Sequence, residues 1–332
     1  MKPRVLVVGG AGYIGSYMVK RLARAGYAVT TFDNFSTGHR DAVCGGDLVE
    51  GDLADAAGLA EFFSAHNFDA VFHFASFIQV GESVQHPAKY YGNNLCNTVN
   101  LLNAMVAAKV TLLVFSSSAA VYGEPACTPI DESHPIAPLS PYGHSKAMVE
   151  QVLRDYARAY DLQSVSLRYF NACGADPEGE LGERHDPETH LIPLALQAVS
   201  GRRGALTIFG DDYDTPDGTC IRDYVHIEDL CEAHLLALRY LQDGGAVEAL
   251  NLGSGKGFSV AEVLRTVEQV TGRAVPVIQG KRRPGDPARL VADATRATAM
   301  LGWVPRYGEL ETIVRHAWAW EQQSGAAKEH GQ

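Results

Sequence analysis

Short, nearly continuous apolar runs alternate with amphipathic stretches through the first half of the chain. Five of these runs have the length and the β-branched character of strands buried on both faces, at residues 4–8, 28–32, 70–75, 111–116 and 164–168. Strands that alternate with helices require crossover connections, and these produce a parallel, doubly wound sheet. The pattern therefore predicts an α/β fold built on such a sheet.

The pattern changes after about Tyr169. Segments rich in Gly, Pro and Asp, at residues 173–188, 210–218 and 282–287, separate shorter apolar elements. Loop-rich regions of this kind often cover a ligand, so they predict a smaller C-terminal lobe that binds substrate. Residues 225–241 and 249–252 again have the pattern of a helix and a buried strand, which indicates that the chain returns to the sheet.

These changes of pattern predict two interleaved parts. The sheet domain takes residues 1–168, with a return segment at residues 223–252. The substrate-binding lobe takes residues 169–222 and 253–325. The polar residues 326–332 are expected to form a frayed tail.

Composition and charge narrow the choice of partners. The 332 residues are 46% hydrophobic and 20% charged, which is enough to bury the core of one large domain or of two associated domains. A formal net charge of −11 argues against nucleic acid or an anionic membrane as partner, because both need clustered Lys and Arg. An anionic ligand must then be held by a few local cations.

The expected compartment is the cytoplasm. Residues 1–8 pass from two basic side chains straight into a short apolar run, without the longer apolar segment and cleavage site of a signal peptide. No apolar run in the sequence is long enough to cross a bilayer. The six cysteines lack the short spacing of a zinc site or a redox motif, so we expect reduced thiols.

A glycine-rich segment follows the first predicted strand. It reads Gly9-Gly10-Ala11-Gly12-Tyr13-Ile14-Gly15, and glycines here let the backbone turn tightly and approach a pyrophosphate. The helix that follows presents unpaired N–H groups to the phosphates. Asp33 lies 18 residues beyond Gly15, where its carboxylate can accept hydrogen bonds from ribose hydroxyls and repel a 2′-phosphate. The segment predicts a Rossmann-type site for NAD rather than NADP, although Asp33 can also be a turn residue.

A helix with a candidate base begins near residue 140. Ser140 can cap this helix, Pro141 suits its first turn, and an apolar stripe follows. Tyr142 and Lys146 are four residues apart and therefore lie on one face, one turn apart. A lysine ammonium near a phenol stabilises the phenolate, so the pair predicts a tyrosine with a lowered pKa that acts as a base. By itself the pair is common by chance and is more typical of a solvated helix surface.

Three serines support the catalytic interpretation. Ser116, Ser117 and Ser118 follow the strand at residues 111–116, at the carboxyl end where open α/β sheets bind ligands. A hydroxyl there can share the substrate proton with Tyr142. We expect Ser118 to have this function, whereas Ser116 and Ser117 can serve simply to cap the strand end.

Together these motifs resemble the extended short-chain dehydrogenases/reductases. The glycine motif, Ser118, Tyr142-x-x-x-Lys146 and Arg168-Tyr169-Phe170-Asn171 are the shared features. The chain is similar in particular to the UDP-galactose 4-epimerases. The motifs of that group are Val80-Gly81-Glu82-Ser83, Ser116-Ser117-Ser118-Ala119-Ala120-Val121-Tyr122-Gly123, Gly218-Thr219-Cys220-Ile221-Arg222-Asp223-Tyr224 and Arg283-Pro284-Gly285-Asp286. The resemblance covers roughly residues 4–320.

The resemblance implies a set of residues that bind NAD. In it, Asp52 and Leu53 would flank the adenine, and Phe170 the nicotinamide. The full set is Gly9, Gly12, Tyr13, Ile14, Gly15, Asp33, Asn34, Ser36, Thr37, Gly38, Asp52, Leu53, Phe74, Ala75, Ser76, Asn93, Ser116, Tyr142, Lys146 and Phe170.

A second implied set binds the UDP-sugar. Arg222 and Arg283 would give charge-assisted contacts to the diphosphate, although an arginine beside an aspartate, as in Arg222-Asp223, is also typical of a structural ion pair. The full set is Ser118, Tyr142, Asn171, His190, Leu191, Thr207, Phe209, Arg222, Arg283, Asp286 and Leu290.

The sequence departs from the family pattern at two positions. Some epimerases have Lys where this chain has Ile78, and Asn where it has His190. The resemblance therefore does not decide whether Ile78 contacts the cofactor or whether His190 contacts the UDP. His185 and His190 raise the question of a metal. A spacing of five residues in a polar loop is poor for one site, so we expect none.

The resemblance implies epimerisation at C4 of a UDP-hexose. Tyr142 would take the proton of the 4-hydroxyl while C4 gives a hydride to NAD, and the 4-keto sugar would turn and take the hydride back on its other face. A nucleotide-sugar 4,6-dehydratase is the nearest alternative, but those enzymes have an Asp-Glu pair where this chain has Ala119-Ala120. A non-catalytic NAD-binding module is a third alternative, and the intact Tyr142, Lys146 and Ser118 argue against it.

Substrate choice and assembly are further expectations. Leu290 matches a position that lines the far wall of the hexose pocket, so its intermediate size predicts UDP-glucose and UDP-galactose as main substrates and weak turnover of UDP-N-acetylglucosamine. A simple packing role for Leu290 has equal weight, and a UDP-pentose remains an alternative substrate. Apolar stripes at residues 95–106 and 149–160 predict a homodimer, since family members pair through these helices.

Overall fold

A seven-stranded parallel sheet forms the centre of the computed structural model, which describes residues 2–283 and 286–329. The strand order is β11-β6-β5-β4-β1-β2-β3, and every neighbouring pair is parallel. The strands are β1 (Arg4–Val8), β2 (Ala28–Asp33), β3 (Asp47–Glu50), β4 (Ala70–His73), β5 (Leu112–Ser116), β6 (Gln163–Tyr169) and β11 (Glu248–Leu252). This order confirms the predicted doubly wound α/β fold.

The two edge strands show what the apolar pattern detects. The strand predicted at residues 249–252 joins the sheet as β11, beside β6. The strand β3 was not predicted, because its sequence Asp-Leu-Val-Glu is half polar and its residues are exposed or half-buried at the opposite edge. An edge strand needs only one neighbour and little burial, so it leaves a weak signal in the sequence.

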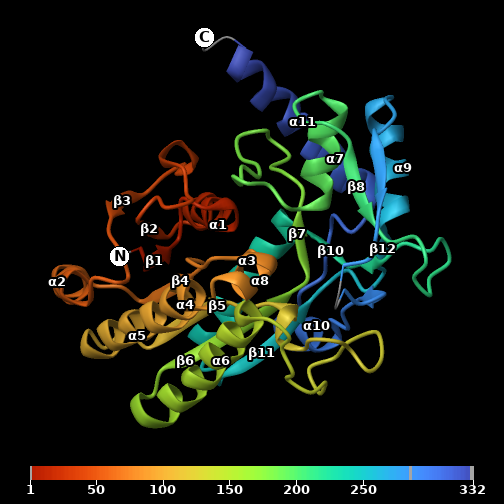
Figure 1. The fold of residues 1–332 in the computed structure, drawn as a ribbon. Coiled ribbons are helices and arrows are strands. Elements are labelled where there is room, and N and C mark those ends of the chain that lie inside the picture. Colours follow the sequence, from red (N-terminus) through yellow and green to blue (C-terminus); the bar gives the residue numbers. More distant parts are fainter. Residues whose placement is uncertain (1, 284–285, 330–332) are drawn as a thin grey trace.

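Helices cover both faces of the sheet (Figure 1). Along β1 the side chains of Val5 and Val7 enter the core that α1 (Tyr13–Arg24), α8 (Ile227–Gln242) and α10 (Thr295–Leu301) share. Leu6 and Val8 point the other way, into the core with α2 (Ala56–Ala65), α5 (Asn97–Ala107) and α6 (Pro141–Tyr160). A strand that alternates between two cores is apolar throughout, which explains the continuous apolar runs.

A second, smaller core lies beyond the carboxyl edge of the sheet. It is built mainly from α7 (Leu191–Val199), α9 (Val260–Thr271) and α11 (Leu310–Glu329), shown at the right and top of Figure 1. Its small sheets pair β7 (Asn171–Cys173) with β10 (Tyr224–His226), β8 (Leu206–Phe209) with β13 (Val277–Gly280), and β9 (Ile221–Arg222) with both β12 (Phe258–Ser259) and β14 (Arg289–Leu290).

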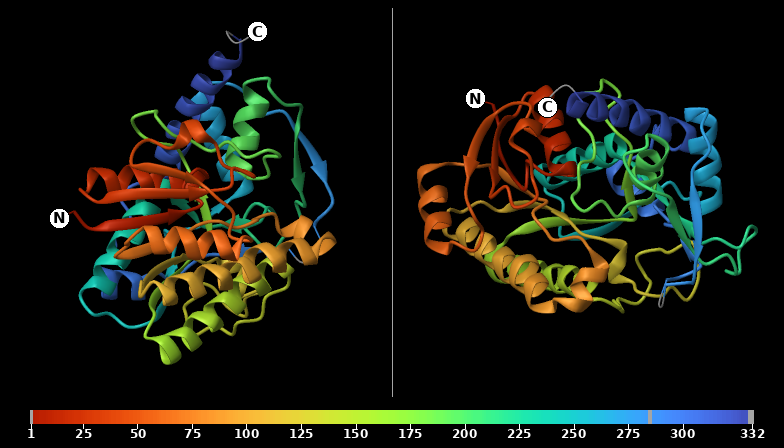
Figure 2. Two further views of the ribbon diagram at one scale, coloured as in Figure 1. Left: turned by 90° about the vertical axis from the view of Figure 1, so that its left-hand side faces the viewer. Right: turned by 45° about the horizontal axis from the view of Figure 1, so that its top comes forward.

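Short elements complete the fold. They are α3 (Val80–Gln85), α4 (Pro87–Tyr90), the 3-10 turns η1 (Arg40–Ala42) and η3 (Ala119–Val121), and a π-helical segment η2 (Tyr91–Cys96). The views in Figure 2 show how the second lobe joins the main sheet.

Two further expectations can be compared with the fold. In the described part of the chain, no helix combines the length and apolar character that a membrane span requires. The helix α11 continues to Glu329 and so includes residues 326–329 of the expected frayed tail, whose fraying stays a prediction. Residues 330–332 lie outside the described part.

Candidate functional site

The glycine-rich segment forms a tight turn between β1 and α1. Gly9 has φ +80°, and a Cβ there would lie 2.5 Å from the backbone nitrogen of Ala75. A Cβ on Gly15 would collide with the carbonyl oxygen of Gly9. Gly12 caps α1 without a side-chain hydrogen bond, so the first N–H groups of the helix face the open side of the turn. The backbone therefore leaves room for a phosphate at a helix N-terminus.

Asp33 fixes the turn from the end of β2. Its Oδ2 accepts a hydrogen bond from the Ala11 N–H (2.9 Å), and its Oδ1 accepts one from the Phe35 N–H (2.8 Å). A carboxylate has about four acceptor positions, so both oxygens can still accept from a ribose. The two interpretations of Asp33, turn residue and ribose acceptor, are thus compatible.

The expected adenine side lies next to Asp33. Asn34 donates from Nδ2 to Asp52 (3.0 Å) and accepts at Oδ1 from the Ser36 N–H (3.0 Å). Leu53 is buried against the core under β2. The structure therefore brings together residues that are about twenty positions apart in the sequence.

A pocket opens above the glycine-rich turn. Its lining residues are Ala11, Gly12, Tyr13, Ser16, Thr37, His39, Ala42, Gly182, Arg184 and His185. The turn supplies N–H donors on one side, and basic side chains from two loops approach on the other. This donor set suits the pyrophosphate of a dinucleotide within an acidic protein.

Tyr142, Lys146 and Ser118 converge at the carboxyl end of β5. Ser140 caps α6 as predicted, with its hydroxyl accepting from the Gly143 N–H (3.2 Å), and this places Tyr142 in the first turn. The Lys146 ammonium donates to the carbonyl oxygen of Ser116 (2.7 Å) and lies 5.9 Å from the centre of the Tyr142 ring. All three side chains are buried.

The electrostatics of this pair differ from the prediction. Burial raises the pKa of Tyr142 above 10.0, and the hydrogen bond with Ser118 only partly offsets this. Burial lowers the pKa of Lys146 to about 7, against the attraction of Glu150. Among the protein's own groups, Lys146 therefore does not lower the pKa of Tyr142 as expected, because the lysine is itself desolvated and donates to the Ser116 carbonyl.

A buried ion pair beneath Lys146 was missed. Glu150 lies one turn further along α6 and forms a bidentate pair with Arg168 (2.9 and 2.6 Å). Its Oε1 also accepts from the Ser117 hydroxyl (2.5 Å). Because Lys146 and Glu150 are four residues apart, the same spacing that singled out Tyr142 and Lys146 could have found Glu150.

The strand-end serines have different partners. Ser116 shares a short hydrogen bond with the Tyr169 hydroxyl, and Ser117 binds Glu150. Ser118 accepts from the Ala120 N–H (3.1 Å) while it also contacts Tyr142. Ser118 thus has the capping role that we expected of Ser116 and Ser117, and it still contacts Tyr142.

The loop after β4 is held by an asparagine that was not predicted. Phe74 and Ala75 continue beside β1, with both N–H groups directed at the Val8 carbonyl (2.8 and 3.2 Å). Asn94, in the π-helical segment, binds both backbone groups of Phe77 (2.9 and 3.0 Å). The predicted Asn93 donates to Asn94 (3.0 Å), and Ser76 donates to the Phe77 carbonyl (3.1 Å).

The predicted UDP-binding side chains come together at the second lobe. Arg222 forms an ion pair with Asp286, and the Arg283 guanidinium lies 3.9 Å from the centre of the Phe209 ring. Leu290 is opposite Arg222 in the pairing of β14 with β9. Three distant sequence segments, around residues 209, 222 and 283–290, thus supply two cations, one carboxylate and apolar surface.

Asp223 does not pair with Arg222. It is fully buried and accepts hydrogen bonds from the backbone of Ser254 (2.6 Å), Gly255 (3.0 Å) and Ala292 (3.1 Å). The alternative of an Arg222–Asp223 ion pair is therefore wrong. Asp223 joins three loops instead, and this leaves Arg222 oriented toward Asp286.

Apolar residues lie between the two lobes. Phe170 and Leu290 pack against one small cluster with Val121, Tyr122 and Ile130. Asn171 donates from both its backbone and its Nδ2 to the Asp223 carbonyl (3.1 and 2.9 Å). The expected nicotinamide residue and the expected sugar-pocket residue thus share one surface.

Three further positions named in the sequence analysis come from separate segments. Leu191 begins α7 and packs partly into the second core. Thr207 lies on β8 opposite Ile278, two residues before Phe209. Ile78, where some epimerases have lysine, is 38% exposed.

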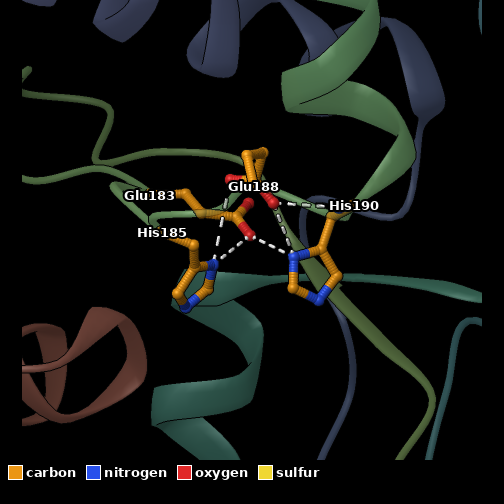
Figure 3. A group of neighbouring side chains, drawn as sticks. All are labelled: Glu183, His185, Glu188 and His190. Atoms are coloured by element: carbon orange, nitrogen blue, oxygen red, sulfur yellow. Dashed lines mark hydrogen bonds and ion pairs between the residues drawn. The ribbon is translucent and has the colours of Figure 1, made fainter. Parts of the chain in front are cut away.

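His190 belongs to a compact cluster with His185, Glu183 and Glu188, which we call the His/Glu cluster (Figure 3). The two imidazole rings are 5.2 Å apart, although we judged their five-residue spacing poor for one metal site. Although burial alone lowers it, the pKa of His190 is raised by the carboxylate of Glu183 and then by Glu188. The two glutamates were missed, because loop conformation rather than a regular period brings them together.

Comparison with known proteins agrees with this geometry. Residues 5–253 match the NAD dependent epimerase/dehydratase family. The UDP-glucose 4-epimerase of Azospirillum brasilense is 52% identical over 321 residues, which are 96% of this chain and 92% of that protein.

Two solved structures extend the comparison. The crystal structure of UDP-glucose 4-epimerase from Brucella ovis in complex with NAD is 52% identical, with a TM-score of 0.93 over 95% of this chain and 97% of that one. The UDP-glucose 4-epimerase from Bifidobacterium longum in complex with NAD+ and UDP is 37% identical, with a TM-score of 0.91 over 97% and 99%.

Proposed function

Because the chain belongs to the NAD dependent epimerase/dehydratase family, we propose that it acts as a UDP-glucose 4-epimerase, interconverting UDP-galactose and UDP-glucose with bound NAD. Its relatives confirm the reaction and the cofactor that the sequence predicted. The observation that carries the assignment is the convergence of Tyr142, Ser118 and Lys146 at the carboxyl end of β5.

The residues around the turn fit NAD. The helix N-terminus at Gly12 would hold the pyrophosphate, and Asp33 would accept from the adenosine ribose. Asp52 and Leu53 would flank the adenine, with Phe170 toward the nicotinamide. Bound NAD supplies a reversible hydride acceptor for C4 of the sugar.

The protein groups handle the proton and the diphosphate. Tyr142, as phenolate, would take the proton of the 4-hydroxyl, and Ser118 would share that proton through its hydrogen bond to the phenol. Lys146, anchored on the Ser116 carbonyl, would supply positive charge to the phenolate. Arg222 and Arg283 would hold the diphosphate so that the sugar stays in the site between the two half-reactions.

The remaining substrate-binding roles surround the two arginines. Asp286 would exchange its ion pair with Arg222 for ribose hydroxyls of the uridine. Asn171, His190, Leu191, Thr207 and Phe209 would complete the UDP site. Leu290 would lie against the hexose, next to Phe170.

The alternative functions have less support. Ala119 and Ala120 begin the η3 turn, where a dehydratase would need an acid and a base. A non-catalytic module has no need of a buried tyrosine in contact with a serine beside a lysine. Another UDP-sugar, with an N-acetyl group or a pentose, remains the nearest alternative, because only the surroundings of Leu290 discriminate against it.

We also propose the two-part organisation and a homodimer. Residues 1–168 with 223–252 would form the NAD domain, and residues 169–222 with 253–325 the substrate lobe; α10 nevertheless packs on the first core. On α6, Met148 and Tyr160 are 42% and 53% exposed, but Val149 and Leu153 of the predicted stripe are buried in the chain's own core, so the proposed pairing through α5 and α6 rests on the family resemblance. A monomer mass in light scattering at micromolar concentration would reject the dimer. The cytoplasmic location stays a prediction.

One preparation tests the proposed function. The protein is purified without added cofactor and denatured, and the supernatant is assayed for NAD and NADP; native protein is assayed for turnover of a panel of UDP-sugars. We expect bound NAD and interconversion of UDP-galactose and UDP-glucose, since a cofactor regenerated in each cycle has no need to leave. NADP, no dinucleotide, or release of a 4-keto-6-deoxy sugar would overturn the proposal.

A further inference from the structure

The His/Glu cluster has an arrangement that UDP binding by His190 does not explain. All four side chains come from one loop between β7 and α7, and Figure 3 shows the imidazoles on either side of the Glu183 carboxylate. The side chains of Glu183 and Glu188 are only 5% and 4% exposed. Two carboxylates buried together need two positive charges nearby. Two imidazolium ions can supply these, and so can one divalent cation.

We propose that Glu183, His185, Glu188 and His190 form a binding site for one divalent transition-metal ion, with Zn2+ the best match. This site is separate from the catalytic tyrosine and does not depend on the proposed epimerase activity. It also replaces the expectation of no metal, which rested on sequence spacing alone.

The distances between the donor atoms fit a small four-coordinate ion. Nδ1 of His190 lies 2.7 Å from Glu183 Oε1 and 2.9 Å from Glu188 Oε1. Nδ1 of His185 lies 2.9 Å from Glu183 Oε1 and 3.8 Å from Glu188 Oε2. Zinc bonds to nitrogen and oxygen of about 2.0–2.2 Å give tetrahedral donor separations of about 3.3 Å. To reach that value, three of these separations would widen by about 0.4–0.6 Å and one would narrow by about 0.5 Å, and the ion would replace the hydrogen bonds that Glu183 Oε1 forms with both imidazoles.

The identity of the donors selects among metals. Two imidazoles and two carboxylates are the nitrogen and oxygen set that Zn2+ takes, whereas Mg2+ and Ca2+ prefer oxygen alone. Glu188 is oriented by its own loop, since its Oε1 accepts from the N–H groups of Thr189 (2.7 Å) and His190 (2.9 Å). Such outer hydrogen bonds fix a ligand before the ion arrives. Both histidines are partly exposed, which gives the ion a way in.

Four protein ligands leave no open coordination position, so the ion would be structural. It would fasten the loop in two directions. His185 packs edge-on against Tyr13 of the glycine-rich turn, at 6.0 Å between ring centres. His190 is the N-cap of α7, whose first residue is Leu191. The ion would thereby connect the NAD side of the site with the UDP side.

The test is a metal titration of the complete protein after dialysis against a chelator. Zn2+ is added in competition with a chromophoric chelator, and Co2+ is added in parallel to record its visible absorption, which is intense only in tetrahedral sites. We expect one equivalent of Zn2+, a Kd tighter than about 1 μM, and a tetrahedral Co2+ spectrum.

Three variants locate the site. His185→Asn and His190→Asn each remove one ligand and should weaken Zn2+ binding by at least about 10-fold. Asn is a favourable N-cap, so the second variant keeps α7 intact. His86→Asn changes an exposed histidine elsewhere and should leave binding unchanged.

The outcomes distinguish a cluster neutralised by two imidazolium ions from a cluster that binds one divalent cation. Native binding that is weaker than this limit, an octahedral Co2+ spectrum, or native Zn2+ affinity retained in both cluster variants would show that the cluster is an ion-pair network only. Turnover of UDP-galactose is measured on the same samples, so loss of the epimerase activity and loss of zinc binding are recorded independently.

Discussion

Removal of the Tyr142 hydroxyl should separate catalysis from binding and stability. In Tyr142→Phe the ring remains in its buried position at the start of α6, and only the phenol oxygen is lost. Among the described residues, the hydrogen-bond partner of this oxygen is Ser118. Ser118 keeps its other bond, to the Ala120 N–H, so no buried group is left without a partner. The free energy of unfolding should fall by no more than about 1 kcal/mol.

The catalytic effect should be much larger. Loss of a general base costs about 10² to 10⁴ in rate, and a factor of ten corresponds to about 1.4 kcal/mol, so the barrier should rise by about 3 to 5 kcal/mol. The bound NAD and the affinity for UDP should stay close to native, because the glycine-rich turn and the two arginines are untouched. The expected signature is therefore a loss of kcat at constant NAD content and constant Kd for UDP.

Tyr17→Phe is the matched control. Tyr17 is another buried tyrosine, and its hydroxyl donates to the Leu181 carbonyl (2.6 Å), far from Tyr142 in the sequence and on the opposite face of the sheet. The Leu181 carbonyl still accepts from the Asp176 N–H (3.0 Å), so the lost hydrogen bond should cost about 0.5–1.5 kcal/mol of stability. Turnover should remain near native. Of the two variants, only Tyr142→Phe should therefore lose turnover.

The assay measures initial rates with saturating UDP-galactose, with urea unfolding and UDP calorimetry on the same preparations. A Tyr142→Phe enzyme that keeps a tenth or more of native kcat would show that another group is the base. A loss of NAD or of folded protein in that variant would show that the phenol is structural. Loss of turnover in Tyr17→Phe would remove the distinction between the two tyrosines.

Three further changes test other parts of the site. Lys146→Met should abolish most turnover yet be more stable than native at pH 7. Between the folded pKa of Lys146, about 7, and its ordinary value of 10.5, only the unfolded chain keeps a proton on this lysine, so the stability advantage of Lys146→Met should shrink by up to about 1.4 kcal/mol per pH unit above 7. A pH-independent difference in urea unfolding would refute the pKa shift. Arg168→Met leaves Glu150 buried and unpaired and should cost about 3–5 kcal/mol of stability, and adding Glu150→Leu should recover most of this loss. A thermal-melt series in which the double variant is no more stable than the single variant would contradict this. Leu290→Tyr should lower kcat/KM for UDP-N-acetylglucosamine about 10- to 200-fold relative to UDP-galactose, and an unchanged ratio would indicate that Leu290 only packs against Phe170.

Most of the sheet and the catalytic helix could be predicted from the sequence. Strands buried on both faces are apolar throughout, so β1, β4 and β5 were visible as runs. The start of α6 was visible because Ser140 and Pro141 are local signals, and the four-residue spacing of Tyr142 and Lys146 follows from helical geometry alone. These features depend on neighbours in the chain, which is why sequence reasoning recovers them.

The UDP side could be predicted only through family resemblance. Arg222, Arg283 and Leu290 come from segments that meet through the pairing of β9 with β14, and no local period relates them. The sequence likewise did not show that Arg222 pairs with Asp286. The adjacent Asp223 accepts backbone hydrogen bonds instead.

Charge and burial were decided by the tertiary structure. The sequence by itself determined the doubly wound sheet, the glycine-rich turn and the Tyr142–Lys146 helix face, because hydrophobic period, backbone sterics and capping act over a few residues. It could not determine that Lys146 is desolvated, that Glu150 and Arg168 neutralise each other beneath it, or that His185 and His190 meet around Glu183. Those properties depend on which distant segments exclude water from a side chain, and only the packed fold fixes that.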